Sequence, residues 1–104
     1  MEERTIYDVI IIGSGPGGMT AALYASRANL KTLILEKGVP GGELLNTSDV
    51  ENYPGFSNIS GPDLADNMYK GAMQFGAEYA YGNVSSIELD GDLRIVHAGK
   101  KSYA

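Results

Sequence analysis

A glycine-rich turn directly after a short apolar run is the feature that most constrains the fold of this chain. Residues 7–12 are mostly apolar and β-branched, which is typical of a strand buried on both faces of a parallel sheet. The next six residues match G-x-G-x-x-G, with glycine at Gly13, Gly15 and Gly18. In this pattern the first glycine permits a tight turn, the second lets a ligand approach the backbone, and the third lets a helix pack closely on the strand. The run therefore predicts a strand–turn–helix unit.

The residues after the turn predict a helix, a second strand and an acidic side chain. Pro16 suits the first helical turn, where its missing N–H costs nothing, and the helix is expected to end near residue 28. Asn29 fits a left-handed stop, residues 32–35 predict the second strand, and Glu36 stands at its carboxyl end. The free N–H groups of the helix would hold a diphosphate, and Glu36, 23 residues after the first glycine, would accept hydrogen bonds from a ribose diol. This context favours a dinucleotide site; the alternative is a glycine turn in an unrelated α/β domain.

Residues 37–60 show no persistent helical or strand period, and a connection of that length usually belongs to a binding site. Gly41 and Gly42 leave the backbone bare where a flat or extended ligand would lie close. Asn52 adds a polar group just before a predicted turn. The alternative is a plain surface loop, or one with a short helix around residues 44–47.

A second helix is predicted to begin at residue 61, with Pro62 in its first turn and Gly76 as its stop. Gly71 inside it indicates close packing against a neighbour. One stripe of the helix is expected to face the core. It comprises Leu64, Met68, Ala72 and Phe75.

The last third of the chain predicts strands. Residues 78–81 are expected to be a third strand of the main sheet, so the turn beyond it would lie on the ligand side. Val84 in that turn is either a backbone contact to an adenine ring or a buried hydrophobic residue. Asp90-Gly91 predicts an antiparallel hairpin, followed by a third strand from residue 101. His97, the sole histidine, is expected to be a surface or half-buried strand residue without a catalytic role.

Charge and cysteine content narrow the function classes. Thirteen acids against eight bases give a net charge of −5 without a basic run, which argues against nucleic acid and anionic membranes as partners. The chain has no cysteine, so it holds no disulfide, thiolate metal site or redox dithiol, and we expect no catalytic or metal-binding residue in it. Glu2 and Glu3 are expected to be solvated, and the acidic start and lack of a long apolar run predict a cytoplasmic chain.

Several segments together resemble the low-molecular-weight bacterial thioredoxin reductases. They are residues 10–22 around the glycine turn, 41–44 (G-G-E-L), 50–56 (V-E-N-Y-P-G-F), 61–64 (G-P-D-L) and 75–77 (F-G-A). The glycine pattern is shared by many flavin enzymes, whereas the V-E-N-Y-P-G stretch is much more specific. The resemblance covers almost every residue present.

The resemblance implies a Rossmann-like α/β domain that binds FAD, with a parallel sheet and a β-meander. By motif match, residues 36–43 would line the FAD, Asn52 would contact its flavin end, and Val84 would lie near the adenine. Glu43 stands where the family usually has glutamine, which puts the donor at that position in doubt. The candidate cofactor-binding residues are Gly13, Ser14, Gly15, Pro16, Gly17, Gly18, Glu36, Lys37, Gly41, Gly42, Glu43, Leu44, Asn52 and Val84.

In the family, NADPH reduces FAD, FAD reduces a Cys-x-x-Cys pair, and the pair reduces thioredoxin, in an enzyme expected to be a homodimer. Residues 1–104 are interpreted as the amino-terminal portion of the FAD-binding domain, without its remainder and without the NADPH domain that carries the cysteines. This incomplete chain alone is expected to be inactive and to bind FAD weakly or not at all. The alternatives are a ferredoxin–NADP reductase of similar fold and a non-catalytic fragment that does not retain FAD. A downstream Cys-x-x-Cys pair would exclude the ferredoxin–NADP reductase.

Overall fold

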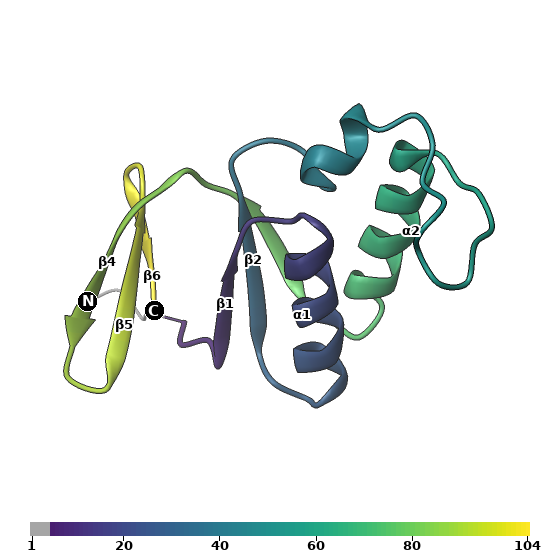
Figure 1. Ribbon diagram of the computed structural model, residues 1–104. Helices are drawn as coiled ribbons and strands as arrows, with labels where there is room; N and C mark the ends of the chain where they lie inside the picture. The colour runs from purple at the N-terminus through teal and green to yellow at the C-terminus, as the bar shows by residue number, and fades with distance from the viewer. Residues whose placement is uncertain (1–4) are drawn as a thin grey trace.

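The computed structural model describes residues 5–104, which form three layers: a pair of α-helices, a parallel sheet and an antiparallel sheet (Figure 1). The parallel sheet lies in the middle, with the helices on one face and the antiparallel sheet on the other. The expectations for Glu2 and Glu3 lie outside the described residues. The α/β class, with a parallel sheet and a β-meander, is confirmed.

Three short strands form the parallel sheet in the order β1 (Val9–Ile12), β2 (Thr32–Glu36) and β3 (Glu78–Tyr81). Successive side chains of a strand point to opposite faces. In β2, Ile34 therefore packs towards the helices, while Leu33 and Leu35 pack towards the antiparallel sheet. Because the strands are parallel, their carboxyl ends meet at one edge of the sheet, as the sequence predicted.

The helices α1 (Pro16–Arg27) and α2 (Gly61–Met73) pack side by side on one face of this sheet (Figure 1). Asn29 stops α1 at a φ of 65°, the left-handed conformation that the sequence predicted. At the start of α2, the Ser60 hydroxyl accepts a 3.2 Å hydrogen bond from the Asp63 amide and so satisfies one free N–H group. The layer between helices and sheet is apolar and tightly closed. Its buried residues are Met19, Ala22, Ile34 and Ala72.

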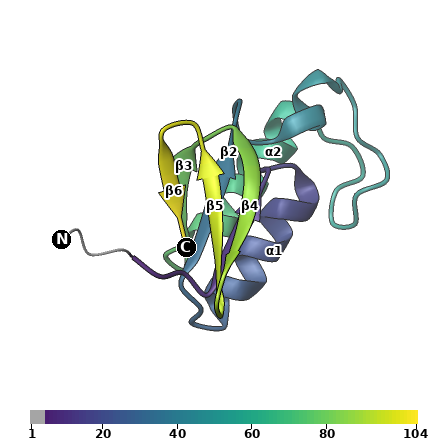
Figure 2. The same ribbon diagram turned by 90° about the vertical axis from the view of Figure 1, so that its left-hand side faces the viewer.

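The antiparallel meander consists of β4 (Val84–Asp90), β5 (Leu93–Ala98) and β6 (Lys101–Tyr103). Figure 2 looks onto this sheet, which lies in front of the parallel strands. Val96 closes the second apolar layer with side chains of β2. The hairpin forms as predicted, but Asp90 pairs with Leu93, so the loop residues are 91 and 92 instead of 90 and 91.

Residues 37–60 contain more structure than their lack of periodicity predicted. A 3-10 helix, η1 (Gly42–Asn46), follows β2, and Val50 pairs with Ile59 in an isolated antiparallel bridge. The loop therefore contains a short helix, two residues earlier than the range 44–47 named in the alternative, while its expected place at a binding site stays a prediction. Such a helix is too short to show a period, and here it is held by tertiary hydrogen bonds such as Gly61 N–H to the Thr47 carbonyl at 2.9 Å.

Three expectations about burial are wrong. Ile12 is 51% exposed, because among the described residues the end of β1 lies at an open groove beside the antiparallel sheet. Phe75 is 48% exposed, because α2 ends at Met73 and the helical stripe ends with it. A Cβ on Gly71 would meet no atom within 4 Å, so this glycine does not mark close packing. None of the helices within residues 5–104 has the length and apolar character needed to cross a membrane.

Candidate functional site

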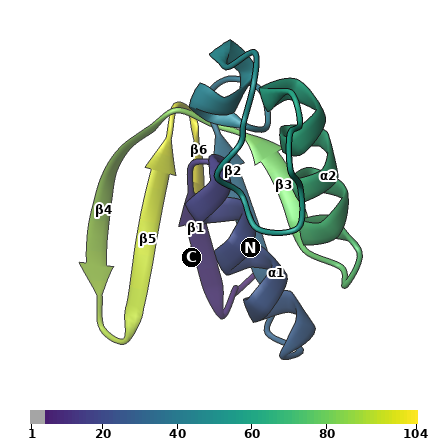
Figure 3. The same cartoon turned by 45° about the vertical axis from the view of Figure 1, so that its right-hand side comes forward.

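A cleft of about 530 Å³ opens at the edge where the carboxyl ends of the parallel strands meet. Figure 3 shows this end of the molecule, with the start of α1, the end of β2 and η1 close to one another. In sheets of this kind, ligands bind outside the carboxyl ends of the strands. The cleft is therefore the leading candidate site. Nine of the predicted residues line it: Gly13, Ser14, Gly15, Pro16, Glu36, Lys37, Gly42, Glu43 and Val84.

The start of α1 presents bare backbone to the cleft. Gly15 is the N-cap, with φ −69° and ψ −178°, and no side chain caps the helix. A Cβ placed on Gly15 or on Gly17 would meet no atom within 4 Å, so both backbones are open to an approaching group. The first N–H groups of a helix have no intrahelical partner and lie at its positive end. This corner favours an anion such as a diphosphate.

Gly18 has a different role, because it faces the strand and not the cleft. A Cβ there would overlap the carbonyl oxygen of Gly13 and come within 3.3 Å of the Ile11 side chain. The close helix–strand packing that the motif predicts is therefore present. Gly13 itself has φ +102°, a conformation that side-chain-bearing residues rarely adopt, and makes the tight turn.

Glu36 lies opposite the glycine turn and is held there by main-chain and side-chain donors. Its Oε1 accepts the Ser14 amide at 2.9 Å and the Ser14 hydroxyl at 2.6 Å, and its Oε2 accepts the Gly38 amide at 2.8 Å. Burial on its own raises the pKa of Glu36, but the donors from Ser14, Gly38 and Lys37 together bring that pKa below its ordinary value. The side chain is thus an ionised hydrogen-bond acceptor beside the turn.

The remaining predicted residues do not line the cleft. Gly17 lies beside it on the open face of α1, and Gly18 lies beneath it. Gly41 packs on α2, where its Cβ would come within 2.6 Å of the Ala65 Cβ, and it has φ +115°. Leu44 is half-buried, with its carbonyl against the start of α2, and Asn52 is exposed in the loop before α2. Gly41 and Leu44 therefore pack against α2 and not against the cleft.

Four further lining residues were not among the candidate cofactor-binding residues, although two of them, Gly82 and Asn83, belong to the turn that the sequence placed on the ligand side. Ile12 and Leu35 are the last apolar residues of their strands, and Gly82 and Asn83 follow β3 directly. Their position at strand carboxyl ends is the signal that identifies them, because a parallel sheet brings all these ends to one edge. Val84 both lines the cleft and packs against the buried layer between the sheets, so the two predicted roles are compatible.

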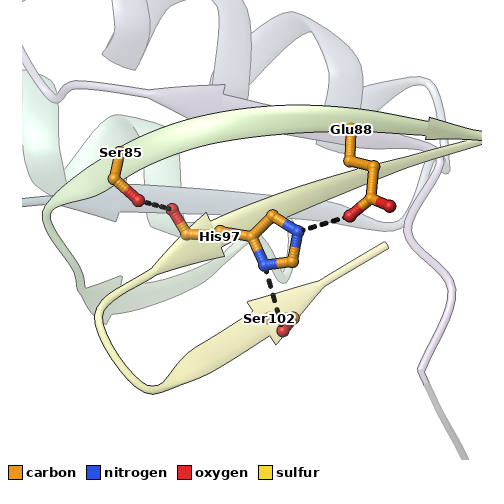
Figure 4. Close-up of polar contacts among 4 residues, drawn as sticks. All are labelled: Ser85, Glu88, His97 and Ser102. Carbon is orange, nitrogen blue, oxygen red and sulfur yellow. Dashed lines mark hydrogen bonds and ion pairs between the residues drawn. The ribbon is translucent and has the colours of Figure 1, made fainter.

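His97 lies outside the cleft, on the antiparallel sheet (Figure 4). Its Nε2 is 2.8 Å from Glu88 Oε1 on the neighbouring strand, and its Nδ1 is 3.5 Å from the Ser102 hydroxyl. The ring is half-buried, as expected. Within residues 5–104, no three His, Cys, Asp or Glu side chains are placed to hold a metal ion.

A glycine turn between a parallel strand and a helix, with an acid at the end of the next strand, defines the dinucleotide-binding class of α/β folds. Comparison with known proteins gives a family within that class. The family described as Pyridine nucleotide-disulphide oxidoreductase matches residues 7–102, and the chain belongs to it.

Relatives of the chain include several thioredoxin reductases. The thioredoxin reductase of Listeria innocua is 63% identical over 102 residues, which are 97% of this chain and 32% of that protein. The thioredoxin reductase of Bacillus subtilis is 59% identical over 104 residues, 99% of this chain and 33% of that protein. The crystal structure of the Streptococcus pyogenes thioredoxin reductase superimposes with a TM-score of 0.92 at 52% identity and covers 97% of this chain and 33% of that one. The chain thus spans about a third of the length of these relatives.

Proposed function

We propose that residues 1–104 supply the adenosine-diphosphate half of an FAD site in a thioredoxin reductase. The observation that carries the proposal is the cleft between the uncapped start of α1 and Glu36. A diphosphate needs bare amides at a helix start, and a ribose diol needs a nearby acceptor. Both lie in one cleft here, and the thioredoxin reductase relatives support FAD as the dinucleotide.

The residues divide into four roles in this proposal. The backbone of Gly15 would meet the diphosphate, with Gly17 beside it at the start of α1, and Glu36 would accept from the adenosine ribose. The half-buried Val84 is the first residue of β4 and lines the cleft, where it would contact the adenine. Lys37, Gly42 and Glu43 border the ribose side, while Asn52 is proposed to meet the flavin end once the rest of the site is present.

The complete protein is proposed to be a cytoplasmic homodimer in which electrons pass from NADPH through FAD to a Cys-x-x-Cys pair and on to thioredoxin. Bound FAD would accept two electrons from the nicotinamide and deliver them to the disulfide. This chain carries no cysteine, so its own residues contribute only binding and orientation. A fragment that lacks the remaining contacts must still order its loops around the ligand, so we expect weak FAD binding by the chain alone.

The test uses ADP, which carries the ribose and diphosphate addressed by the cleft. Titration of the ¹⁵N-labelled chain should move the amide signals of Gly15, Gly17 and Gly18 in a saturable way. Gly15→Val should abolish these shifts, because its side chain would occupy the position of the diphosphate. Gly71→Val is the matched control: its position in α2 is equally open but lies outside the cleft, so it should leave binding unchanged.

Two results would overturn the proposal. One is the absence of any ADP-dependent shift in the unaltered chain. The other is a Gly15→Val chain that is folded and binds ADP as well as the Gly71→Val control. A parallel absorbance titration with FAD checks the expectation of weak flavin binding: the chain should bind FAD weakly and lose it on gel filtration.

A further inference from the structure

The Ser14 side chain has a position that the glycine motif does not require. It is fully buried, at 0% exposure, and its hydroxyl donates to Glu36 Oε1 at 2.6 Å. The backbone amide of Ser14 reaches the same oxygen at 2.9 Å. A single residue of the turn therefore supplies two donors to the acid of the next strand.

Tyr79 is not hydrogen-bonded to this pair. The Tyr79 hydroxyl, from β3, is buried and has no hydrogen-bond partner within residues 5–104. Its ring is held edge-on against the Tyr69 ring, with centroids 5.6 Å apart. Burial raises the pKa of Tyr79, the Ser14 hydroxyl opposes that rise, and the Glu36 charge adds to it.

The donors around Glu36 also limit what else it can bind. A carboxylate has about four lone-pair sites, and the three hydrogen bonds of 2.9 Å or less, from Ser14 and Gly38, occupy three of them, with the Lys37 amide as a weaker neighbour. The remaining capacity is on Oε2. Two other charged side chains line the cleft: Lys37, next to Glu36 in the chain, and Glu43 from η1. Their charges are opposite in sign. The Ser14 hydroxyl is therefore the one side-chain donor to the carboxylate within residues 5–104.

We propose that Ser14 is a positioning residue for ribose recognition: it holds the Glu36 carboxylate ionised and turned towards the cleft. A carboxylate fixed in this way can only accept, so it selects a sugar with a free hydroxyl over one that lacks it or carries a phosphate there. The ribose as ligand rests on the proposed function. The Ser14–Glu36 contact does not.

The first experiment measures the Glu36 pKa directly, from the ¹³C shift of its carboxyl carbon against pH. Ser14→Ala should raise the Glu36 pKa, because an ionised acceptor loses a donor. Ser26→Ala is the matched control. Ser26 is another buried serine of this segment, and its hydroxyl donates to the Ala22 carbonyl at 2.6 Å inside α1, so its loss should leave the Glu36 pKa unchanged.

A second variant guards against a Ser14→Ala chain that fails to fold. Ser14→Cys nearly preserves the side-chain volume and offers a weaker donor, so it should raise the Glu36 pKa by less than Ser14→Ala. The positioning role is overturned when both variants titrate like the Ser26→Ala control.

The second experiment asks whether this contact affects ligand choice. ADP should bind the unaltered chain more tightly than 2′-deoxy-ADP. Ser14→Ala should weaken ADP binding by about fivefold to tenfold, equivalent to the ~1–1.4 kcal/mol of one typical hydrogen bond, and should reduce the preference over 2′-deoxy-ADP. In a Glu36→Gln background the same change should have little further effect, because Ser14 acts through the carboxylate.

The outcomes separate the two claims. A raised Glu36 pKa in Ser14→Ala together with no ADP binding by the unaltered chain would overturn the ribose ligand and the proposed function, while supporting the Ser14–Glu36 contact. An unchanged pKa together with normal ADP binding would overturn the positioning role and leave the proposed function intact. A loss of ADP affinity that is equally large in the Glu36→Gln background would also overturn the positioning role.

Discussion

The amide of Tyr7 donates a 2.8 Å hydrogen bond to the carbonyl of Ala104, so the chain's last residue lies beside the start of β1. Ala104 is buried there, at 5% exposure. β1 pairs only with β2 among the described strands, which leaves its other edge next to the antiparallel sheet (Figure 1). A groove of about 540 Å³ lies between the two sheets. The apolar side chains of Ile12, Ile87 and Leu89 are exposed at it.

This groove predicts self-association of the chain. Exposed apolar surface beside an unpaired strand edge favours association with another chain. Leu89→Lys should shift association to about tenfold higher protein concentration, equivalent to ~1.4 kcal/mol, as measured by sedimentation equilibrium. The control is Tyr24→Lys on α1, because Tyr24 is 69% exposed against 70% for Leu89 but lies outside the groove. Equal effects of the two substitutions would show that the groove is not the contact.

Gly18 and Gly17 should respond differently to the same substitution. Gly18→Ala places a methyl group against the Gly13 carbonyl, so it should destabilise the fold by about 3 kcal/mol through overpacking. Gly17→Ala enters open space and should change stability by less than about 0.5 kcal/mol. Urea unfolding of both variants measures the difference. Similar midpoints would mean that α1 is not packed on the turn as described.

Glu36 should make stability sensitive to acid. Its pKa is lower in the folded chain than the ordinary 4.5, so the folded state binds this proton less readily than the unfolded state. The stabilisation is therefore complete above the ordinary glutamate range and is lost as the pH falls through the lowered folded-state pKa.

The check is the pH dependence of the free energy of unfolding in Glu36→Gln and in Glu51→Gln. Glu36→Gln should flatten the decline below about pH 4.5, because it removes the group whose pKa shifts. Glu51 is exposed in the loop before α2, so its replacement should leave the slope as it was. An unaltered slope in Glu36→Gln would contradict the hydrogen-bond pattern around this acid.

Tyr79→Phe distinguishes an unpaired hydroxyl from one that donates to Ser14. Removal of a buried hydroxyl without a partner is neutral or stabilising, whereas loss of a buried hydrogen bond costs about 1 kcal/mol. We expect a neutral or slightly stabilising effect in thermal or urea unfolding, because the Tyr79 hydroxyl has no hydrogen-bond partner within residues 5–104. Tyr81→Phe on the same strand is the control, because Tyr81 is 72% exposed and its hydroxyl loss should change stability by less than about 0.5 kcal/mol. A Tyr79→Phe chain that is about 1 kcal/mol less stable than this control would show that the Tyr79 hydroxyl does have a hydrogen-bond partner.

The strands, the helices and the glycine turn could be read from the sequence because their signals are local. Alternation, helical spacing and turn residues act within a few positions, as at Asn29 and Gly13. The same reasoning was wrong at Phe75, where a helical stripe was extended past the end of α2. It also assigned Gly41 to the ligand, because a bare backbone looks the same in sequence whether it faces a ligand or, as here, a neighbouring helix.

By itself the sequence determined the order of strands and helices, the uncapped start of α1 and the acid at the end of β2. Only the tertiary structure decided that Ser14, 22 residues before Glu36, holds that acid, and that Asn52 lies away from the cleft. The physical reason is the distance along the chain over which each interaction acts. Backbone propensities depend on near neighbours, whereas the partners of a buried hydroxyl or carboxylate depend on which strands meet at the edge of a sheet.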